Sequence, residues 1–163
     1  MKVIVFVGLP GAGKSTKAKE FESQGYVIHS VDSIRNEFNL HEQNDISKVL
    51  NIFNERLIID LNAKKNIVYD STNLSVKHRK DILNILKAFN CEKICYVFIV
   101  PIEICKQRNA KRIGYSKVTD DEYNIMVNRF SIPTSDEGWD KIILYNQDKK
   151  VTFEEVLYDK ICL

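Results

Sequence analysis

The sequence predicts an α/β fold in which a mostly parallel sheet is covered by helices on both faces. Short apolar runs alternate along the chain with segments whose apolar residues recur every three or four positions. This alternation is typical of strand–helix–strand units. The 163 residues contain no repeat and no Pro/Gly-rich linker, so we expect a single domain over residues 1–163. Ligands of such sheets bind beyond the carboxyl ends of the strands, which makes the segments after the strands the candidate functional regions.

Five apolar runs are expected to be strands because helix-like or turn-forming segments bound each of them. In chain order they are Val3–Val7, Tyr26–His29, Ile67–Tyr69, Ile94–Val100 and Ile142–Leu144.

The helices are expected where the apolar period is helical and where start and stop signals agree with it. Gly25 can end the first helix, Pro101 suits a first turn, and Thr119 and Glu122 form a capping-box pattern. The expected helices run from the first loop to Gln24, over 32–38, from an Asp45 N-cap through Leu61, over 75–89, from Pro101 to about Ile113, from Thr119 to Phe130, and onward from a second capping box at Thr152–Glu155.

Composition excludes several classes of protein. The net charge of +2 gives no bulk attraction to long nucleic acid. The cysteines, which have no Cys-x2-Cys spacing, predict neither a zinc site nor a disulfide framework. The first apolar run is too short for a signal peptide, and no run is long enough to span a membrane, so we expect a cytoplasmic protein. The cysteines are Cys91, Cys95, Cys105 and Cys162.

The histidines and the single tryptophan carry no clear functional signal. His29, His41 and His78 do not cluster, and we expect them to be structural or surface residues. Trp139 is expected to pack against the last strand.

The segment Gly8–Ser15 follows the first apolar run and has the pattern Gly-x4-Gly-Lys-Ser. Glycines let backbone N–H groups turn toward phosphates where a Cβ would intrude, and the helix that follows presents its N-terminus to the same anion. Lys14 is expected to reach the β- and γ-phosphates, Ser15 to offer its hydroxyl to Mg²⁺, and Thr16 to lie beside the α-phosphate. The sequence therefore predicts a bound nucleoside triphosphate.

Asp32 and Arg35 follow the second strand and share one face of a helix, since they are three residues apart. A carboxylate near the γ-phosphate can accept the proton of an attacking hydroxyl, and an arginine beside it can grip a substrate phosphate. The alternative is that Asp32 caps the helix and Arg35 is solvated. Their place at the carboxyl end of a strand favours the functional interpretation.

Asp70 directly follows the third strand, where an acid beside a phosphate loop can support Mg²⁺ through water or by holding Ser15. A plain turn over Asp70–Asn73 is the alternative.

After the fourth strand, Arg108 and Arg112 lie in a basic segment with no acid between Glu103 and Asp120, and can close over a triphosphate. A solvated basic helix is the alternative there. The other basic residues of this segment are Lys106, Lys111 and Lys117.

Four motifs, in order, resemble the polynucleotide 5′-hydroxyl kinase domains of phage and bacterial RNA repair, within the adenylate-kinase-like group of phosphate-loop kinases. They are the loop Gly8–Thr16, the pair Asp32-x-x-Arg35, the segment Asp70-x-Thr72-Asn73-Leu74 with Arg79 shortly after it, and the lid-like segment Arg108–Gly114 with Arg112 at the catalytic position. No phosphatase or ligase domain accompanies these motifs, so a bare kinase module is expected. The stretch Phe38–Asn44 contains no Lys or Arg and matches nothing in that family.

The resemblance implies a P-loop NTPase fold: a three-layer α/β/α sandwich with a five-stranded parallel sheet of order 2-3-1-4-5 and a short helical lid at about 106–118. It implies ATP as the phosphoryl donor with Mg²⁺. Lys14, Asp32, Arg35 and Arg112 would be catalytic, Arg108 would assist Arg112 at the nucleotide, and Ser15 and Asp70 would serve the metal. The loop residues Gly8, Gly11, Ala12, Gly13, Lys14, Ser15 and Thr16 would bind the nucleotide, and Asp32, Arg35, Thr72, Asn73 and Arg79 would contact the substrate.

Three functions remain open from the sequence. The first is a kinase acting on the 5′-OH of a polynucleotide or oligonucleotide, and the second is the same fold acting on a small hydroxyl-bearing molecule such as a nucleoside, sugar or antibiotic. The third is a regulatory nucleotide-binding ATPase, against which the Asp32–Arg35 pair and the basic lid argue. The motifs locate the donor side better than the acceptor side, and they do not specify an oligomeric state.

Overall fold

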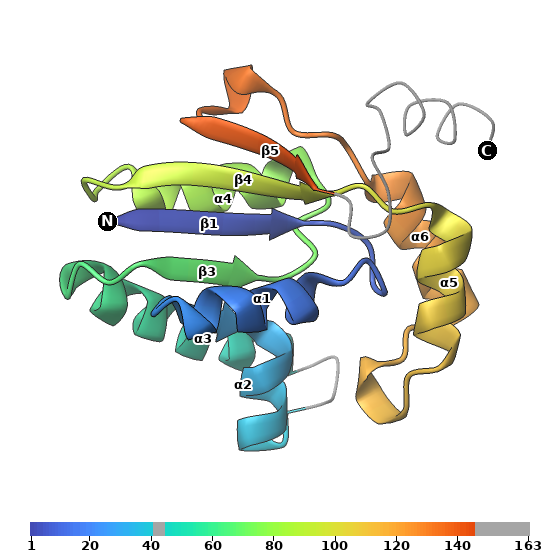
Figure 1. Cartoon of the computed structure of the whole chain (residues 1–163). Helices are drawn as coiled ribbons and strands as arrows, with labels where there is room; N and C mark the ends of the chain where they lie inside the picture. Colours follow the sequence, from blue (N-terminus) through green and yellow to red (C-terminus); the bar gives the residue numbers. More distant parts are fainter. Residues whose placement is uncertain (41–44, 146–163) are drawn as a thin grey trace.

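A five-stranded parallel sheet lies between two layers of helices (Figure 1). The computed structural model describes residues 1–40 and 45–145. The strand order is β2-β3-β1-β4-β5, as expected, and all four strand pairs are parallel. The strands are β1 (Lys2–Val7), β2 (Val27–Ser30), β3 (Ile67–Asp70), β4 (Glu92–Phe98) and β5 (Lys141–Tyr145).

The helices alternate with the strands along the chain, and three of them begin at a Ser or Thr whose side chain accepts a backbone N–H. These caps are Ser30, Ser75 and Thr119, the last in a complete capping box with Glu122. The helices are α1 (Lys14–Ser23), α2 (Val31–Phe38), α3 (Ile46–Asn62), α4 (Val76–Leu86), α5 (Ile102–Ala110) and α6 (Asp120–Arg129), with the 3₁₀ turns η2 (Gly114–Ser116) and η3 (Ser135–Glu137).

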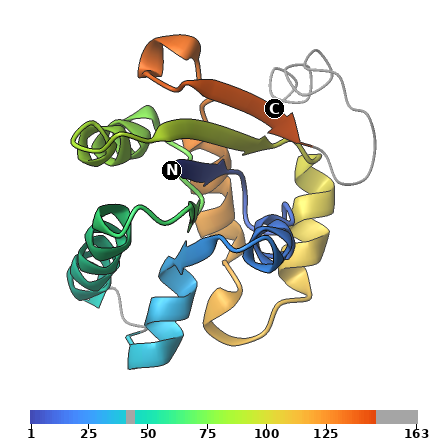
Figure 2. The same ribbon diagram turned by 60° about the vertical axis from the view of Figure 1, so that its left-hand side comes forward.

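The core consists of two apolar layers, one on each face of the sheet. Since side chains alternate along a strand, the odd-numbered residues of β1 pack with α3 and α4 and the even-numbered ones with α1, α5 and α6. Figure 2 shows α3 and α4 on one side of the sheet and α1 and α5 on the other. The buried helical residues include Phe53, Leu57 and Leu86 in the first layer and Ala18, Cys105 and Tyr123 in the second.

Several element boundaries differ from the expected ones. The fifth helix ends at Ala110, three residues early, because the Asn109 side chain bonds to both backbone groups of Val118 and folds the chain back there. Asp45 holds the N-cap position of α3 without a side-chain capping bond. The helix expected from Thr152–Glu155, as well as His41 and Cys162, lies outside the described residues.

Trp139 belongs to the buried cluster against which Ile142 of β5 packs, in agreement with its expected packing. His29 is also buried, and its Nε2 lies 3.0 Å from a carboxylate oxygen of Asp60. Within the described parts of the chain, no helix combines the length and apolar character needed to cross a membrane.

Arg79 of α4 is fully buried and ties several distant segments together. Its Nε and Nη2 donate to the two carboxylate oxygens of Glu137 at 2.7 and 2.6 Å. Its Nη1 donates to the carbonyl oxygens of Asn73, Leu74 and Ser131 at 3.2, 2.9 and 3.0 Å, and Nη2 also reaches the Ser131 hydroxyl at 3.1 Å. A buried guanidinium requires partners for all its donors, and here those partners fix the chain that follows β3.

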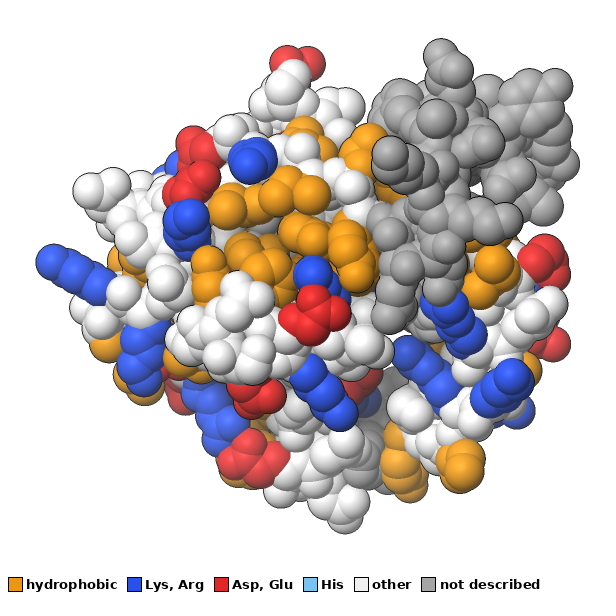
Figure 3. Space-filling view, in the orientation of Figure 1, with side chains coloured by type: hydrophobic (Ala, Val, Ile, Leu, Met, Phe, Trp, Pro, Cys, Tyr) orange, Lys and Arg blue, Asp and Glu red, His pale blue; other side chains and the backbone are white. Residues whose placement is uncertain are grey.

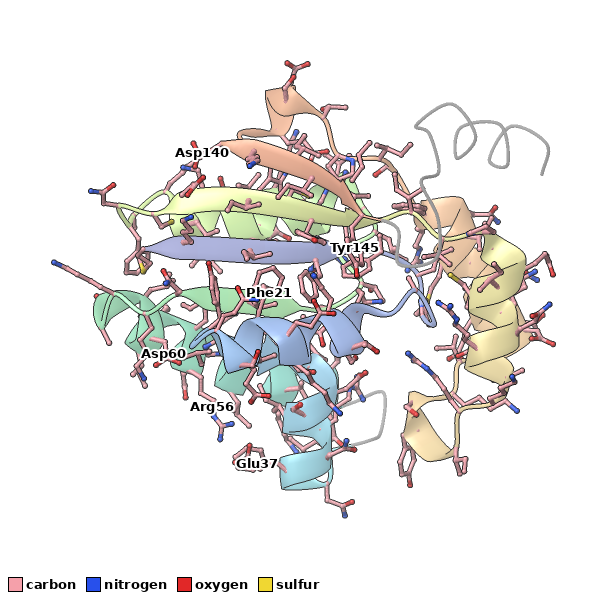
Figure 4. The ribbon with its side chains drawn as sticks, in the orientation of Figure 1. Phe21, Glu37, Arg56, Asp60, Asp140 and Tyr145 are labelled. Carbon is pink, nitrogen blue, oxygen red and sulfur yellow. The ribbon has the colours of Figure 1, made fainter. Side chains whose placement is uncertain are left out.

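Replacing Arg79 with Met should lower the free energy of unfolding by about 3–5 kcal/mol, because the buried Glu137 carboxylate would lose its partner. Urea denaturation measures this loss. Arg56→Met is the matched control, since Arg56 makes a bidentate pair with Glu37 at 2.7 Å on the exposed side of α2 and α3 (Figure 4). That exposed pair should contribute less than about 1 kcal/mol. Equal losses in the two variants would contradict a structural role for Arg79.

Candidate active site

The phosphate loop between β1 and α1 packs against α5, and this contact requires glycine at position 11. Gly11 has φ +88°, and a Cβ there would lie 2.3 Å from the carbonyl oxygen of Cys105. Tyr123 of α6 also supports the loop, since its hydroxyl donates to the Pro10 carbonyl at 3.0 Å. The loop is therefore held by α5 and α6 as well as by the strand that precedes it.

The N-terminus of α1 differs from those of α2, α4 and α6, which have side-chain caps. Its N-cap residue is Gly13, at φ 91°, and no side chain accepts its first backbone N–H groups. These donors, together with the positive end of the helix dipole, form a ready site for an anion. Ser15 and Thr16 lie exposed in this first turn, where a phosphate would reach them.

Lys14 is buried, with 9% of its surface exposed, and its ammonium group lies inside the loop. Its Nζ donates to the carbonyl oxygens of Gly8 and Leu9 at 2.9 and 3.0 Å. Burial lowers the pKa of Lys14 to about 8, against the opposing charge of Asp70. A cation that has already lost its hydration shell interacts strongly with a phosphate placed beside it.

Asp70 is the last residue of β3 and is 8% exposed. Burial raises its pKa, and the nearby Asp32 charge adds to this rise, whereas the Lys14 charge and a hydrogen bond from Ser15 oppose it. Asp70 and Ser15 are therefore in contact, as their expected joint role requires.

Asp32 lies in the first turn of α2 and is exposed, and it does not cap that helix. The cap is Ser30, whose hydroxyl accepts the Ser33 N–H at 3.3 Å, so the alternative reading of Asp32 as a cap is wrong. The charge of Asp32 acts on Lys14 and on Asp70, raising the pKa of each. Asp32 therefore does not cap α2, and its carboxylate lies within electrostatic reach of the phosphate-binding groups.

Arg35 lies one turn after Asp32 and is half-buried. Its Nη1 lies 3.4 Å from the carbonyl oxygen of Leu40, a long contact at the end of α2.

The segment after β3 joins the strand ends together. The Thr72 carbonyl accepts the Gly8 N–H at 3.0 Å, and the Asn73 side chain donates to the Phe6 carbonyl at 2.8 Å. Arg79 is fully buried, so the structure gives its side chain structural partners in place of the substrate contact expected from the sequence. A guanidinium without exposed surface has no face to offer a substrate. Asn73 is buried as well, and its side chain has a structural partner in the Phe6 carbonyl.

Arg108 and Arg112, from the segment expected to be a lid, face the loop. Together with Gly11 and residues 13–16 they line a cavity of about 280 Å³. The Arg108 Nη1 lies 3.4 Å from the Gly11 carbonyl, and the Arg112 Nη1 donates to the Ser116 carbonyl at 3.1 Å. The Arg112 charge lowers the pKa values of both Lys14 and Asp70, and Figure 3 shows Lys and Arg side chains gathered over α5 and η2.

A second cavity, of about 380 Å³, lies between α2, α3, α4 and the end of β3. Val31, the residue before Asp32, forms part of its wall, and Thr72 and Asn73 line it near the phosphate loop. Its lining therefore includes the residue next to Asp32 and the segment that follows β3.

A family model described as an AAA domain matches residues 3–133. The chain belongs to this family. Its α/β fold, strand order and phosphate loop are those of a P-loop kinase, and its relatives include polynucleotide kinases.

Three known proteins resemble this P-loop kinase over much of its length. The L-seryl-tRNA(Sec) kinase of Methanococcus maripaludis is 25% identical over 95% of the chain, which spans 63% of that relative. The bifunctional polynucleotide phosphatase/kinase of Schizosaccharomyces pombe is 26% identical over 86% of the chain, which spans 32% of that relative. A chain of the Pnkp1/Rnl/Hen1 complex is 25% identical with a TM-score of 0.58, covering 74% of this chain and 42% of its own.

Two residues that support the kinase site were not expected from the sequence. Asn109 of α5 is buried and donates to the Val118 carbonyl, and the hydroxyl of Tyr123 in α6 donates to the Pro10 carbonyl. Their partners are 9 and 113 positions away in the chain, so no local pattern signals either contact.

ATP binding by this P-loop kinase should take up protons at about pH 9. Lys14 is charged below pH 8 and loses its proton as the pH rises through its pKa of about 8, whereas bound phosphates favour the charged form and raise that pKa. Calorimetry in two buffers of different ionisation enthalpy measures the uptake. Lys14→Met should abolish it, and uptake that survives this change would exclude Lys14 as the group that titrates.

Proposed function

We propose that this P-loop kinase transfers the γ-phosphoryl group of ATP to the 5′-OH of a polynucleotide or oligonucleotide. The observation that carries the proposal is the position of Asp32. Its charge acts on both Lys14 and Asp70, so a carboxylate able to take a proton from a hydroxyl lies within electrostatic reach of the groups that would hold the γ-phosphate.

On the donor side, the loop amides and Lys14 would hold the β- and γ-phosphates in the anion site at the start of α1. Arg112, with Arg108 beside it, would neutralise the charge that develops on the transferring group. The proposal is supported by the cavity that these residues share, which has a guanidinium from the lid on one side and the loop on the other.

The residues at the carboxyl edge also fit Mg²⁺. Asp70 and Ser15 supply the oxygen ligands that Mg²⁺ prefers, and Mg²⁺ is usually held by one or two carboxylates together with substrate phosphates. A cation beside the buried Asp70 would favour its ionised form, which burial disfavours. When bound, Mg²⁺ would neutralise charge on the phosphates.

On the acceptor side, Asp32 would align the hydroxyl and accept its proton, and Arg35 would grip a phosphate of the acceptor. The name of the Schizosaccharomyces pombe relative, a bifunctional polynucleotide phosphatase/kinase, supports a nucleic-acid acceptor. We also propose that the protein acts in the cytoplasm, since Cys91, Cys95 and Cys105 are free thiols.

A small hydroxyl-bearing molecule is the second candidate, because none of the described residues that line the cavity between α2, α3 and α4 is a Lys or Arg. A panel of acceptors with γ-labelled ATP separates the two. We expect label on a 5′-OH oligonucleotide and none on the same oligonucleotide with a 5′-phosphate. Label on a nucleoside, sugar or antibiotic with unlabelled oligonucleotides would support the second candidate.

Asp32→Asn should lower kcat for the oligonucleotide by about 10²–10⁴-fold, because the general base would be lost. The dissociation constant of ATP should stay nearly unchanged, since among the described residues Asp32 has no hydrogen bond or ion pair with the loop. Asp136→Asn, an exposed carboxyl in η3, is the matched control and should leave kcat as it is. Full activity of the Asp32 variant would exclude its role as base.

Arg35→Ala should raise KM for a 5′-OH nucleoside 3′-phosphate by about 10–100-fold, the effect of losing a hydrogen bond between charged groups. The same change should affect the matching nucleoside, which has no phosphate, and ATP much less. Initial rates with the three substrates measure this. Equal losses for all of them would contradict a phosphate grip by Arg35.

A further inference from the structure

The cavity between α2, α3 and α4 has an apolar wall and a polar rim. Ile46 and Leu50 of α3 are each 39% exposed and line this cavity, so two large hydrophobic side chains there are in contact with water. Ile82 and Ile85 of α4 continue this wall. A flat apolar ring placed in the cavity would cover side chains that are now in contact with water.

Among the described residues, the polar rim includes an acid and neither Lys nor Arg. Asp81 and His78 lie three residues apart on α4 and both line the cavity, with the Asn54 carboxamide and the Tyr69 side chain among the other polar groups. Burial, with the Asp81 charge as a second cause, raises the pKa of Tyr69 to about 12, so the phenol keeps its proton near the carboxylate. Such a rim repels phosphate and favours a neutral group that donates hydrogen bonds.

The rim is also held in place. The Ser75 hydroxyl caps α4 at its start, where it accepts the His78 N–H at 3.3 Å. Arg79, between His78 and Asp81, is the fully buried residue that anchors this helix. The Asp81 carboxylate is therefore presented by a fixed helix and not by a loop.

We propose that this cavity holds the 5′-terminal nucleobase of the acceptor and that Asp81 reads its N–H donors, so that guanine is preferred over uracil. The inference rests on the proposed function and adds the base selectivity of the same site. Guanine presents two adjacent donors on its Watson–Crick edge, N1–H and N2–H₂, to a carboxylate with two acceptor oxygens. Uracil presents one donor between two carbonyl oxygens, which the carboxylate repels. Arg35 would hold the phosphate that follows the base.

The test uses four 5′-OH oligonucleotides that differ only in the 5′-terminal base. For the wild-type protein, kcat/KM should be at least about tenfold higher with guanine than with uracil, the discrimination typical of a paired base edge. Adenine and cytosine, each with one amino group, should lie between them. Equal kcat/KM values for the four would overturn the inference and leave the proposed function standing, whereas transfer to none of them would overturn both.

Asp81→Asn should reduce the ratio of guanine to uracil to within about threefold, because a carboxamide donates as well as accepts. The KM for ATP should not change. The control Asp136→Asn should keep the wild-type ratio, and a preserved ratio in the Asp81 variant would overturn the inference.

An oligonucleotide with 5′-inosine, which lacks the N2 amino group, tests the same point on the wild-type protein. It should react several-fold more slowly than the guanine form, and an equal rate would count against the reading by Asp81.

Discussion

The buried pair of Arg79 and Glu137 is the interaction on which the arrangement of the site depends. The guanidinium has no exposed surface, and its donors are shared between a carboxylate 58 positions away and the backbone just after β3. That backbone in turn contacts the other strands, through the Thr72 carbonyl to Gly8 and the Asn73 side chain to Phe6. The carboxyl ends of β1 and β3 are thus held together before any ligand binds.

Groups with opposite requirements meet at this edge. Lys14 and Asp70 are both buried. Burial lowers the pKa of Lys14 and raises the pKa of Asp70, which favours the neutral form of each, whereas their mutual attraction favours the charged forms. Water is partly replaced there by fixed charges and by the uncapped start of α1. A site of this kind is suited to stabilising charge on a phosphate, because the protein and not the solvent supplies the surrounding dipoles.

The sequence predicted the sheet and the loop because apolar periodicity and a glycine pattern are local signals. The strand order followed from the resemblance to phosphate-loop kinases. The sequence did not predict the role of Arg79, since a basic residue on a helix looks the same whether a distant carboxylate reaches it or a substrate does. The cap of α2 was also ambiguous, because Ser30 and Asp32 are both good capping residues and only the geometry selects Ser30. Asn109 and Tyr123 were missed for the same reason, as their partners are defined by tertiary packing.

The measurement that tests the central claim most directly is the stoichiometry of a single turnover. Protein in excess over ATP is mixed with a 5′-OH oligonucleotide, and the amounts of ADP, inorganic phosphate and 5′-phosphorylated oligonucleotide are followed together. If the carboxyl edge of the sheet is a phosphoryl-transfer site with Asp32 directed at a hydroxyl, each ADP should be matched by one 5′-phosphate. ADP matched by inorganic phosphate, with the oligonucleotide unchanged, would contradict that account and indicate an ATPase.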